Sequence, residues 1–251
     1  MIAAVILAAG RGTRLRPRTE NQPKPLISIF GKPIIEHTLF SLRKAGVKSI
    51  ILVIGYLGDY IKKHLGDGSH LGLKIQYCHN PHYMLENAIS LKVADKFLQR
   101  NKPFLLLMGD HYFDEVMIEE AVKNSNRQPL LCIDKNPLYP PQVKDATRVL
   151  VNEEGYIIDI GKNIPVWNAT DTGLFLLDNL IFDVIALLER QKPNLTITDC
   201  IKHLSLNVKP VWGCDVTGHL WFDIDTPEDV KFVESFLCRG GNVKCQENGM
   251  E

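Results

Sequence analysis

The sequence carries no excess of either charge, because 29 lysine and arginine residues balance 29 aspartate and glutamate residues. A protein that holds nucleic acid or an anionic membrane through its overall charge needs a basic surplus, which this chain lacks. We therefore expect no nucleic-acid partner. Any positive charge that matters for function must be concentrated locally.

Long hydrophobic runs are also missing. No segment approaches the about 18 unbroken apolar residues that are typical of a membrane-spanning helix. The apolar run from Ile2 to Ala9 is too short to span a bilayer, and no basic stretch precedes it as in a signal peptide. These absences predict a soluble, cytoplasmic protein with no membrane insertion.

Cysteines are few and show no metal-binding or redox spacing. None of the six forms a C-x-x-C pair: Cys78, Cys132, Cys200, Cys214, Cys238 and Cys245. Scattered thiols in a chain of this length indicate small buried apolar residues in a reducing compartment, not a disulfide framework. His79 and His82 do not indicate a zinc site either, because a proline lies between them and no third ligand is evident.

The first half of the chain alternates short apolar runs with amphipathic patterns. These patterns predict strands at 2–7, 49–54, 73–78 and 104–108, and helices at 33–45, 59–65 and 87–98. Such alternation is typical of an α/β fold with a mixed, mostly parallel sheet covered by helices on both faces.

After about residue 140 the pattern becomes richer in strands. A hairpin is predicted over 147–151 and 156–160, followed by a strand at 172–177 and helices at 180–189 and 227–236. No linker separates the two parts. We expect one domain over residues 1–238 and a disordered polar tail over 239–251.

The first predicted strand runs directly into the small-residue loop Ala8-Ala9-Gly10-Arg11-Gly12-Thr13-Arg14. Loops after parallel strands bind ligands, and successive backbone N–H groups can hold phosphate oxygens. The Walker spacing is absent, and Leu15 replaces the third glycine of the dinucleotide-binding motif. Arg14 can grip phosphates in a planar fork, and Lys24, held between two prolines, adds a point charge. A solvated basic loop is the alternative interpretation.

Three segments, Leu7 to Pro17, Pro23 to Leu26 and Gly31 to Pro33, resemble the nucleotidyltransferase family that makes nucleotide sugars and related compounds. The resemblance implies a Rossmann-like fold and a nucleotide-binding half of about 1–135, with an acceptor-binding half of about 136–238. It implies that Arg14 and Lys24 hold the triphosphate as catalytic groups. The expected nucleotide-binding residues are Leu7, Ala8, Ala9, Gly10, Gly12, Thr13, Arg14, Lys24, Asn87 and Ser90.

Carboxylates follow two predicted strands. Asp110 ends the strand at 104–108, and Asp223 and Asp225 alternate before the helix that starts at Pro227. Mg²⁺ prefers oxygen ligands and needs only one or two carboxylates besides phosphates and water. The family resemblance assigns Asp110 and Asp223 as catalytic metal ligands, with Asp225 in reserve. Alternatively, Asp225 caps the following helix.

The acceptor is indicated by a narrower resemblance. The segments Met108 to Tyr112, Asp145 to Val149 and Asp171 to Phe175 are similar to inositol-1-phosphate cytidylyltransferases. Carboxylates of Asp145 and Asp171 can accept polyol hydroxyl protons, and Lys162 matches the lysine with which that family contacts the acceptor phosphate. A choline pocket would need aromatic faces instead, for which the candidates are Tyr83, Tyr112, Tyr139 and Trp167.

Asn87 lies in a segment, Leu85 to Leu91, that replaces the Gly-Thr-Ala type segment of sugar-phosphate enzymes. Its amide can both donate to and accept from a base edge, although capping of its own helix is an equal alternative. His111, next to Asp110, either touches substrate or packs near that carboxylate.

The hypothesis is a nucleotidyltransferase that uses Mg²⁺ to convert CTP and inositol 1-phosphate to CDP-inositol and pyrophosphate. Its partners would be these small molecules, and the sequence gives no oligomeric state. Alternative acceptors are phosphocholine, a phosphonate or a sugar 1-phosphate. A different class, a regulatory module that binds a nucleotide without catalysis, would form no product with any acceptor.

Overall fold

The computed structural model of the chain describes residues 2–137, 139, 143 and 145–239. Its strands are β1 (Ala3–Ala8), β2 (Ser28–Ile29), β3 (Lys32–Pro33), β4 (Ser49–Ile54), β5 (Lys74–His79), β6 (Phe104–Met108), β7 (His111–Phe113), β8 (Leu130–Asp134), β9 (Arg148–Val151), β10 (Ile157–Gly161), β11 (Ala169–Leu177), β12 (Trp212–Asp215) and β13 (Trp221–Asp223). Its helices are α1 (Arg18–Asn21), α2 (Ile34–Lys44), α3 (Gly58–Leu65), α4 (Asn87–Lys92), α5 (Glu115–Lys123), α7 (Leu180–Leu188), α8 (Ile197–Asn207) and α9 (Pro227–Arg239).

A nine-stranded mixed sheet organises these elements, with the path β10-β9-β11-β6-β1-β4-β5 and with β8 and β12 attached through β11. Strands β6, β1, β4 and β5 are parallel neighbours. Strand β11 runs antiparallel to β6 and joins the two parts of the chain in one sheet. The predicted α/β class with a mixed, mostly parallel sheet is therefore confirmed.

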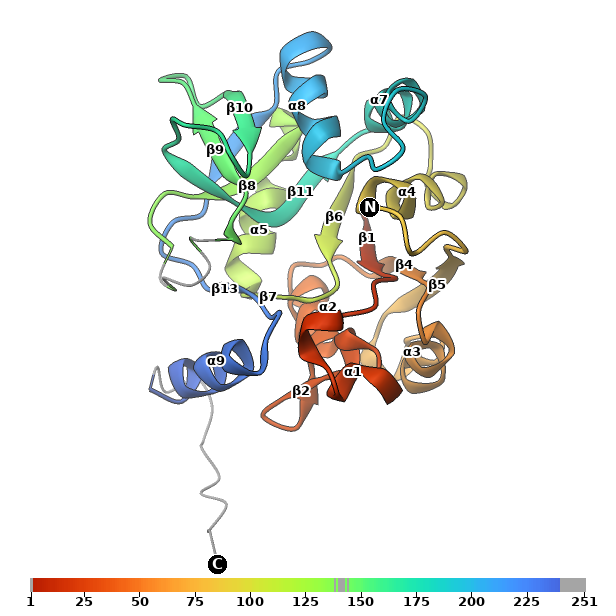
Figure 1. The fold of residues 1–251 in the computed structure, drawn as a ribbon. Coiled ribbons are helices and arrows are strands. Elements are labelled where there is room, and N and C mark those ends of the chain that lie inside the picture. Colours follow the sequence, from red (N-terminus) through yellow and green to blue (C-terminus); the bar gives the residue numbers. More distant parts are fainter. Residues whose placement is uncertain (1, 138, 140–142, 144, 240–251) are drawn as a thin grey trace, which may run out of the picture.

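Helices cover both faces of the sheet (Figure 1). Helices α2, α3 and α5 contribute apolar residues to one buried cluster, and α4, α7 and α8 contribute to another. Along β1, Val5 belongs to one cluster while Ala4 and Ile6 belong to the other. Burial on both faces explains why this strand is apolar at consecutive positions instead of alternating.

A third cluster lies at the end of the molecule where α9 packs, and includes Leu15, Ile34, Phe222 and Val233. Among the described residues, no helix has the length and apolar character needed to cross a membrane. Arg239 closes α9, and the remainder of the predicted tail, residues 240–251, lies outside the described part.

Most predicted elements are present with boundaries shifted by one to three residues. The predicted helix 87–98 is shorter, because α4 ends at Lys92 and a 3₁₀ turn follows over Asp95–Phe97. Helices α5 and α8 were not predicted, although each begins with a capping signal. Asp114 accepts hydrogen bonds from the N–H groups of the first turn of α5, and Thr196 begins a capping box at α8.

Four of the cysteines are buried and free, as predicted: Cys78, Cys132, Cys200 and Cys214. Cys238 is disulfide-bonded, so the prediction of unpaired thiols is wrong at this position.

Candidate active site

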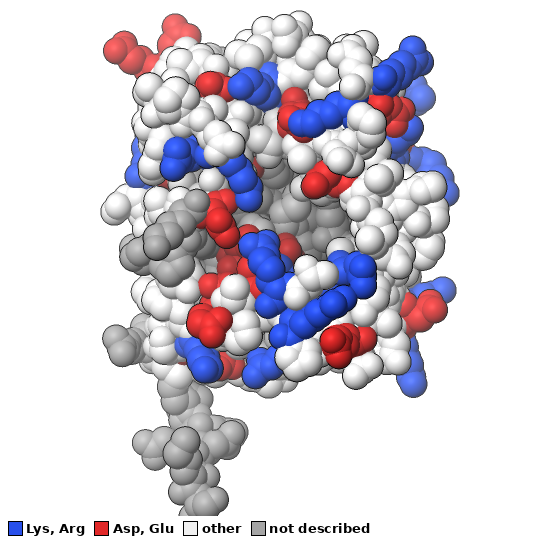
Figure 2. Space-filling model, in the orientation of Figure 1, with Lys and Arg blue, Asp and Glu red and all other residues white. Residues whose placement is uncertain are grey.

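Two adjoining cavities open beyond the carboxyl ends of β1 and β6. The smaller, of about 190 Å³, is lined by the first loop and Lys24, and the larger, of about 480 Å³, extends toward β11 and α8. Arg14, Asp110 and Asp225 line both cavities, so the two form one cleft. Figure 2 shows this face hollowed at its centre, with basic and acidic side chains around the hollow.

Strand pairing brings the two loops together. Because β1 and β6 are parallel neighbours, the loops that follow them leave the sheet at the same edge. Gly109 donates its N–H to the carbonyl of Leu7 over 2.9 Å, and a Cβ at Gly109 would lie 2.6 Å from that carbonyl oxygen. Glycine is needed here for a close approach between backbones, and this approach places Asp110 beside the first loop.

Gly12 fixes the path of the first loop against Lys24. Its φ of +59° lies in the left-handed region, and an added Cβ would lie 2.8 Å from Cβ of Lys24. The Thr19 hydroxyl donates to the Gly12 carbonyl over 2.8 Å. Through these contacts the loop packs directly on the lysine stem.

Lys24 is the centre of a group of charges. It is 5% exposed, and its Nζ lies 2.7 Å from Asp110 Oδ2, 2.6 Å from Asp225 Oδ1 and 3.8 Å from Asp223 Oδ1. Burial alone would lower the pKa of Lys24, but the three carboxylates outweigh burial and raise it. Lys24 is therefore a fixed cation, and the expected convergence of Lys24, Asp110 and Asp223 is present.

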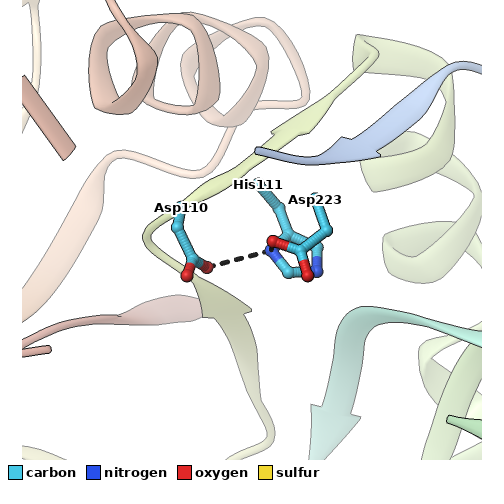
Figure 3. A group of neighbouring side chains, drawn as sticks. All are labelled: Asp110, His111 and Asp223. Atoms are coloured by element: carbon cyan, nitrogen blue, oxygen red, sulfur yellow. Dashed lines mark hydrogen bonds and ion pairs between the residues drawn. The ribbon is translucent and has the colours of Figure 1, made fainter. Parts of the chain in front are cut away.

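Asp110, His111 and Asp223 form a second group around the same point (Figure 3). His111 and Asp223 face each other in the antiparallel pair β7–β13, which explains how residues far apart in sequence meet. His111 Nδ1 lies 2.9 Å from Asp110 Oδ1. Burial would lower the pKa of His111, but Asp223 and Asp110 raise it to about 9, so the ring donates to Asp110 at neutral pH.

The two metal-ligand candidates differ in how their charge is compensated. Burial acts to raise the pKa of Asp110, but Lys24 and then His111 hold it well below its usual range. The pKa of Asp223 is raised to about 6, mainly by burial and further by Asp110, against the lowering effect of His111. Asp223 Oδ1 is buried and accepts no hydrogen bond from the described residues.

A divalent cation fits this arrangement. Asp110, His111 and Asp223 offer ligand atoms that all lie within 4.8 Å of one another. A buried carboxylate oxygen without a hydrogen bond is costly, and a bound cation would compensate its charge. Asp110 and Asp223 are therefore the residues that could hold a divalent metal.

Asp225 has a different environment from Asp223. Its Oδ1 is paired with Lys24, and its Oδ2 lies 2.5 Å from Arg14 Nη2. It does not cap α9: the Thr226 hydroxyl accepts the N–H of Asp229 in the first turn of the helix, and the Asp229 carboxylate accepts the N–H groups of Thr226 and Asp225 in return. The alternative cap role for Asp225 is therefore wrong.

The predicted acceptor residues Asp145, Lys162 and Asp171 all line the larger cavity. Asp171 Oδ1 accepts the N–H of Gly173 over 2.7 Å. Burial raises the pKa of Asp171 to about 6, although this hydrogen bond acts to lower it. Asp145 is exposed and lies 3.5 Å from Arg14.

Two of the predicted nucleotide-binding residues, Ser90 and Ala9, do not line the described part of the cleft. Ser90 is 6% exposed, its hydroxyl accepts from Asn80 Nδ2, and it is absent from the described lining of both cavities. Ala9 is also absent from these linings, and its carbonyl accepts the N–H of Tyr56. Of the predicted first-loop residues, the smaller cavity is lined by Leu7, Ala8, Gly10, Gly12, Thr13 and Arg14.

Asn87 lines the larger cavity, but its amide oxygen is already used. Oδ1 accepts the N–H of Ile197, the first residue of α8, over 2.8 Å. This bond occupies one of the two lone pairs of Oδ1 and restrains the orientation of the amide. Glu86, not Asn87, is the cap residue of α4, so the capping alternative is wrong.

Several lining residues were not predicted as site residues, among them Thr147, Gly173, Thr198 and Glu228. Of the four aromatic residues proposed for a choline pocket, only Tyr139 lies among the described lining residues, and its hydroxyl donates to Asp229. The capping box at Thr196 was the one local signal that could have placed Thr198 at a helix start.

Comparison with known proteins agrees with this geometry. A family model described as nucleotidyl transferase matches residues 3–239. The bifunctional IPC transferase and DIPP synthase of Aquifex aeolicus is 32% identical over 241 residues, covering 94% of this chain and 52% of that protein. The bifunctional protein GlmU of Methanococcus maripaludis is 32% identical over 232 residues, covering 90% and 52%.

Among solved structures, the inositol-1-phosphate CTP transferase from T. maritima superposes with a TM-score of 0.80 at 28% identity, covering 98% of both chains. The chain spans about half the length of the curated relatives that it matches.

Proposed function

This chain belongs to the nucleotidyl transferase family, and we propose that it transfers the cytidylyl group of CTP to inositol 1-phosphate. An oxygen of the acceptor phosphate forms a bond to the α-phosphorus of CTP. The bond from that phosphorus to the bridging oxygen breaks, and pyrophosphate leaves with the electron pair. The products are CDP-inositol and pyrophosphate.

The observation that carries this proposal is the single cleft in which cations and carboxylates meet. Lys24 and Arg14 lie on the side of the first loop, and Lys162 lines the side of the larger cavity. An attacking phosphate and a triphosphate both need cationic partners, on opposite sides of the point where they react. No protein nucleophile is required, because the acceptor phosphate is already ionised near neutral pH.

In the nucleotide half, we assign binding of the triphosphate to Arg14 and Lys24 and to backbone N–H groups of the first loop. Lys24 is fixed before the substrate arrives, so little reorganisation accompanies the development of charge on the leaving pyrophosphate. The backbone of Ala8 and Gly10 would face the nucleoside.

Nucleotidyl transferases generally use a divalent metal, and we propose Mg²⁺ with Asp110 and Asp223 as its protein ligands. The bound ion would supply positive charge that offsets the negative charge of the reacting phosphates. The oxygen-rich donor set and the buried, unbonded Oδ1 of Asp223 support this assignment. His111 is assigned to hold the Asp110 carboxylate in position through Nδ1.

For the acceptor, we assign the polyol hydroxyls to Asp145 and Asp171 and the phosphate to Lys162. The cavity of about 480 Å³ is large enough for a small cyclic polyol phosphate. The similarity to a solved inositol-1-phosphate CTP transferase over 98% of both chains supports this acceptor. Of the four aromatic residues proposed for phosphocholine, three are absent from the described lining, although Phe175 and Trp221 do line the larger cavity.

A sugar 1-phosphate is the second candidate acceptor, favoured by the similarity to GlmU. The test is pyrophosphate release measured for ATP, CTP, GTP and UTP against inositol 1-phosphate, phosphocholine and glucose 1-phosphate. We expect the highest kcat/KM for CTP with inositol 1-phosphate. A preference for UTP with glucose 1-phosphate would contradict the proposal, and nucleotide binding without any product would indicate a regulatory module.

A further inference from the structure

Asp225 bridges the two cations of the nucleotide side. One of its carboxylate oxygens is paired with Lys24 at 2.6 Å, and the other is paired with Arg14 at 2.5 Å. We propose that Asp225 is not a metal ligand but a positioning residue, which holds Arg14 and Lys24 together for one triphosphate. The inference rests on the proposed function, in that the triphosphate is the ligand of both cations.

The contrast with Asp223 separates the two roles. Both oxygens of Asp225 already accept from a cation, and its side chain is 14% exposed. Asp223 Oδ1 is buried without a hydrogen bond, and Asp223, not Asp225, shares the group of atoms within 4.8 Å that could hold a metal. Asp223 Oδ1 has only longer ion-pair contacts, 3.8 Å from Lys24 and 3.7 Å from His111, so it remains open to a metal. Both oxygens of Asp225 are instead held in short ion pairs with the two cations that a triphosphate would bind.

The backbone that carries Asp225 is fixed. The Asp229 carboxylate accepts the N–H groups of Asp225 and Thr226, and the Thr226 hydroxyl accepts the N–H of Asp229. This box ties Asp225 to the start of α9, which packs through Val230 and Val233 into a buried cluster. A carboxylate held in this way is a rigid anchor for the long side chains that bind it.

Asp225 does not use up the donors that a triphosphate needs. Lys24 has three N–H donors, of which Asp110 and Asp225 take two. Arg14 has five, and only two of its nitrogens approach a carboxylate. Donors therefore remain for phosphate oxygens while both ion pairs persist.

Arg14 gains most from the contact. Its side chain is 56% exposed, so without an anchor it would sample many rotamers and lose that freedom when the nucleotide binds. Asp225 imposes this ordering beforehand. Its negative charge also repels the triphosphate, but salt weakens this longer-range repulsion more than the short ion pair that positions Arg14.

The experiment compares Asp225→Asn with Asp223→Asn by titrating CTP calorimetrically, once in EDTA and once in Mg²⁺, at about 0.15 M salt. Asparagine keeps one acceptor oxygen, but an NH₂ group replaces the other and cannot accept from a cation. We expect Asp225→Asn to weaken CTP binding about tenfold under both conditions, since the loss of positioning does not involve the metal. Asp223→Asn should weaken binding only in Mg²⁺.

Asp159→Asn is the matched control, because Asp159 pairs with Lys202 outside the described lining of both cavities. Thermal unfolding of each variant shows whether the fold is kept. If Asp225→Asn weakened CTP binding in Mg²⁺ but not in EDTA, Asp225 would be a metal ligand and the inference would be overturned. Unchanged or tighter binding in both conditions would also overturn it.

A double-mutant cycle with Arg14→Gln tests whether Asp225 acts through the arginine. If it does, adding Asp225→Asn to Arg14→Gln weakens binding by less than half of its effect, on the logarithmic scale, in the wild-type background. Fully additive losses would contradict the positioning role. The proposed function is tested separately by pyrophosphate release with the wild-type chain. If that assay shows a preference for a nucleotide other than CTP, the double-mutant cycle is run with the preferred nucleotide.

Discussion

Lys24 Nζ lies 2.7 Å from Asp110 Oδ2, although 86 positions separate the two residues. The contact joins the loop after β1 to the turn after β6, and it is made in a partly buried environment where both groups keep their charge. The lysine expected to hold phosphate is thus also the counter-ion of an expected metal ligand. Under the proposed assignments, nucleotide binding and metal binding are coupled through this one side chain.

Removal of that lysine should abolish most of the activity. We expect Lys24→Ala to lower kcat/KM for CTP by about 10²–10³, because one preorganised cation is lost where charge develops. Pyrophosphate release measures the effect, and circular dichroism checks the fold. Lys135→Ala, which removes a surface ion pair with Asp215, is the control. A fall of less than about threefold would be incompatible with the assigned role.

Asp223→Asn should change the metal requirement. The amide keeps the shape but loses the charge of the oxygen that has no hydrogen bond. We expect the Mg²⁺ concentration for half-maximal rate to rise by about tenfold or more. The rate is measured as a function of Mg²⁺ at saturating CTP. Unchanged magnesium dependence would refute Asp223 as a ligand.

Lys162→Ala should weaken the binding of the acceptor and not the binding of the nucleotide. A charge-assisted contact to a phosphate contributes enough that its loss should raise KM for inositol 1-phosphate by about tenfold or more. KM for CTP should change by less than about twofold, because Lys162 is absent from the lining of the smaller cavity. Lys202→Ala, on the surface, serves as the control. A rise in KM for CTP alone would reverse the assignment.

Gly109→Ala should lower stability, because its Cβ would lie 2.6 Å from the Leu7 carbonyl oxygen. Strands β1 and β6 must move apart, which we expect to cost about 1–3 kcal/mol of unfolding free energy. Gly10→Ala is matched to it, because nothing lies within 4 Å of a Cβ there. Its unfolding free energy should stay within about 0.5 kcal/mol of the wild type. Denaturant unfolding measures the unfolding free energy of both variants. Equal losses of unfolding free energy would contradict the need for a glycine at position 109.

Asp171 should make stability depend on pH. Its pKa rises from 3.8 in the unfolded chain to about 6 in the fold, so the folded state binds more protons between these values. This contribution to stability is fully present below the unfolded pKa and is lost as pH rises through about 6. Since Asp171→Asn cannot ionise, its melting temperature relative to the wild type should increase from pH 4 to pH 7.

Asp215→Asn gives the opposite trend as a control. Burial acts to raise the pKa of Asp215, but Thr217 and Lys135 lower it overall, so its contribution is present at neutral pH and lost in acid. The effect should be small, because the side chain is 44% exposed. If both variants followed the same trend, the assigned cause for Asp171 would be wrong.

Local sequence patterns were sufficient for seven of the nine strands in the described sheet, but β8 and β12 were not predicted. Strands β4 and β6 were predicted at their observed bounds, because apolar runs bounded by helices encode burial on both faces. The first loop, Lys24 and Asp110 were recognised from motifs of adjacent residues. Such features depend on the near neighbours in the chain, which a sequence displays directly.

The partners of the site residues were decided by the tertiary structure alone. Asp225 and Lys24 are 201 positions apart, and Asn87 and Ile197 are 110 apart, so no local pattern shows that they meet. Only strand pairing and the packing of α8 and α9 determine which oxygen is already bonded and which is left for a ligand. The sequence by itself determined which chemical groups are present, and the fold determined which of their atoms remain available, because hydrogen-bond capacity is consumed by contacts between distant segments.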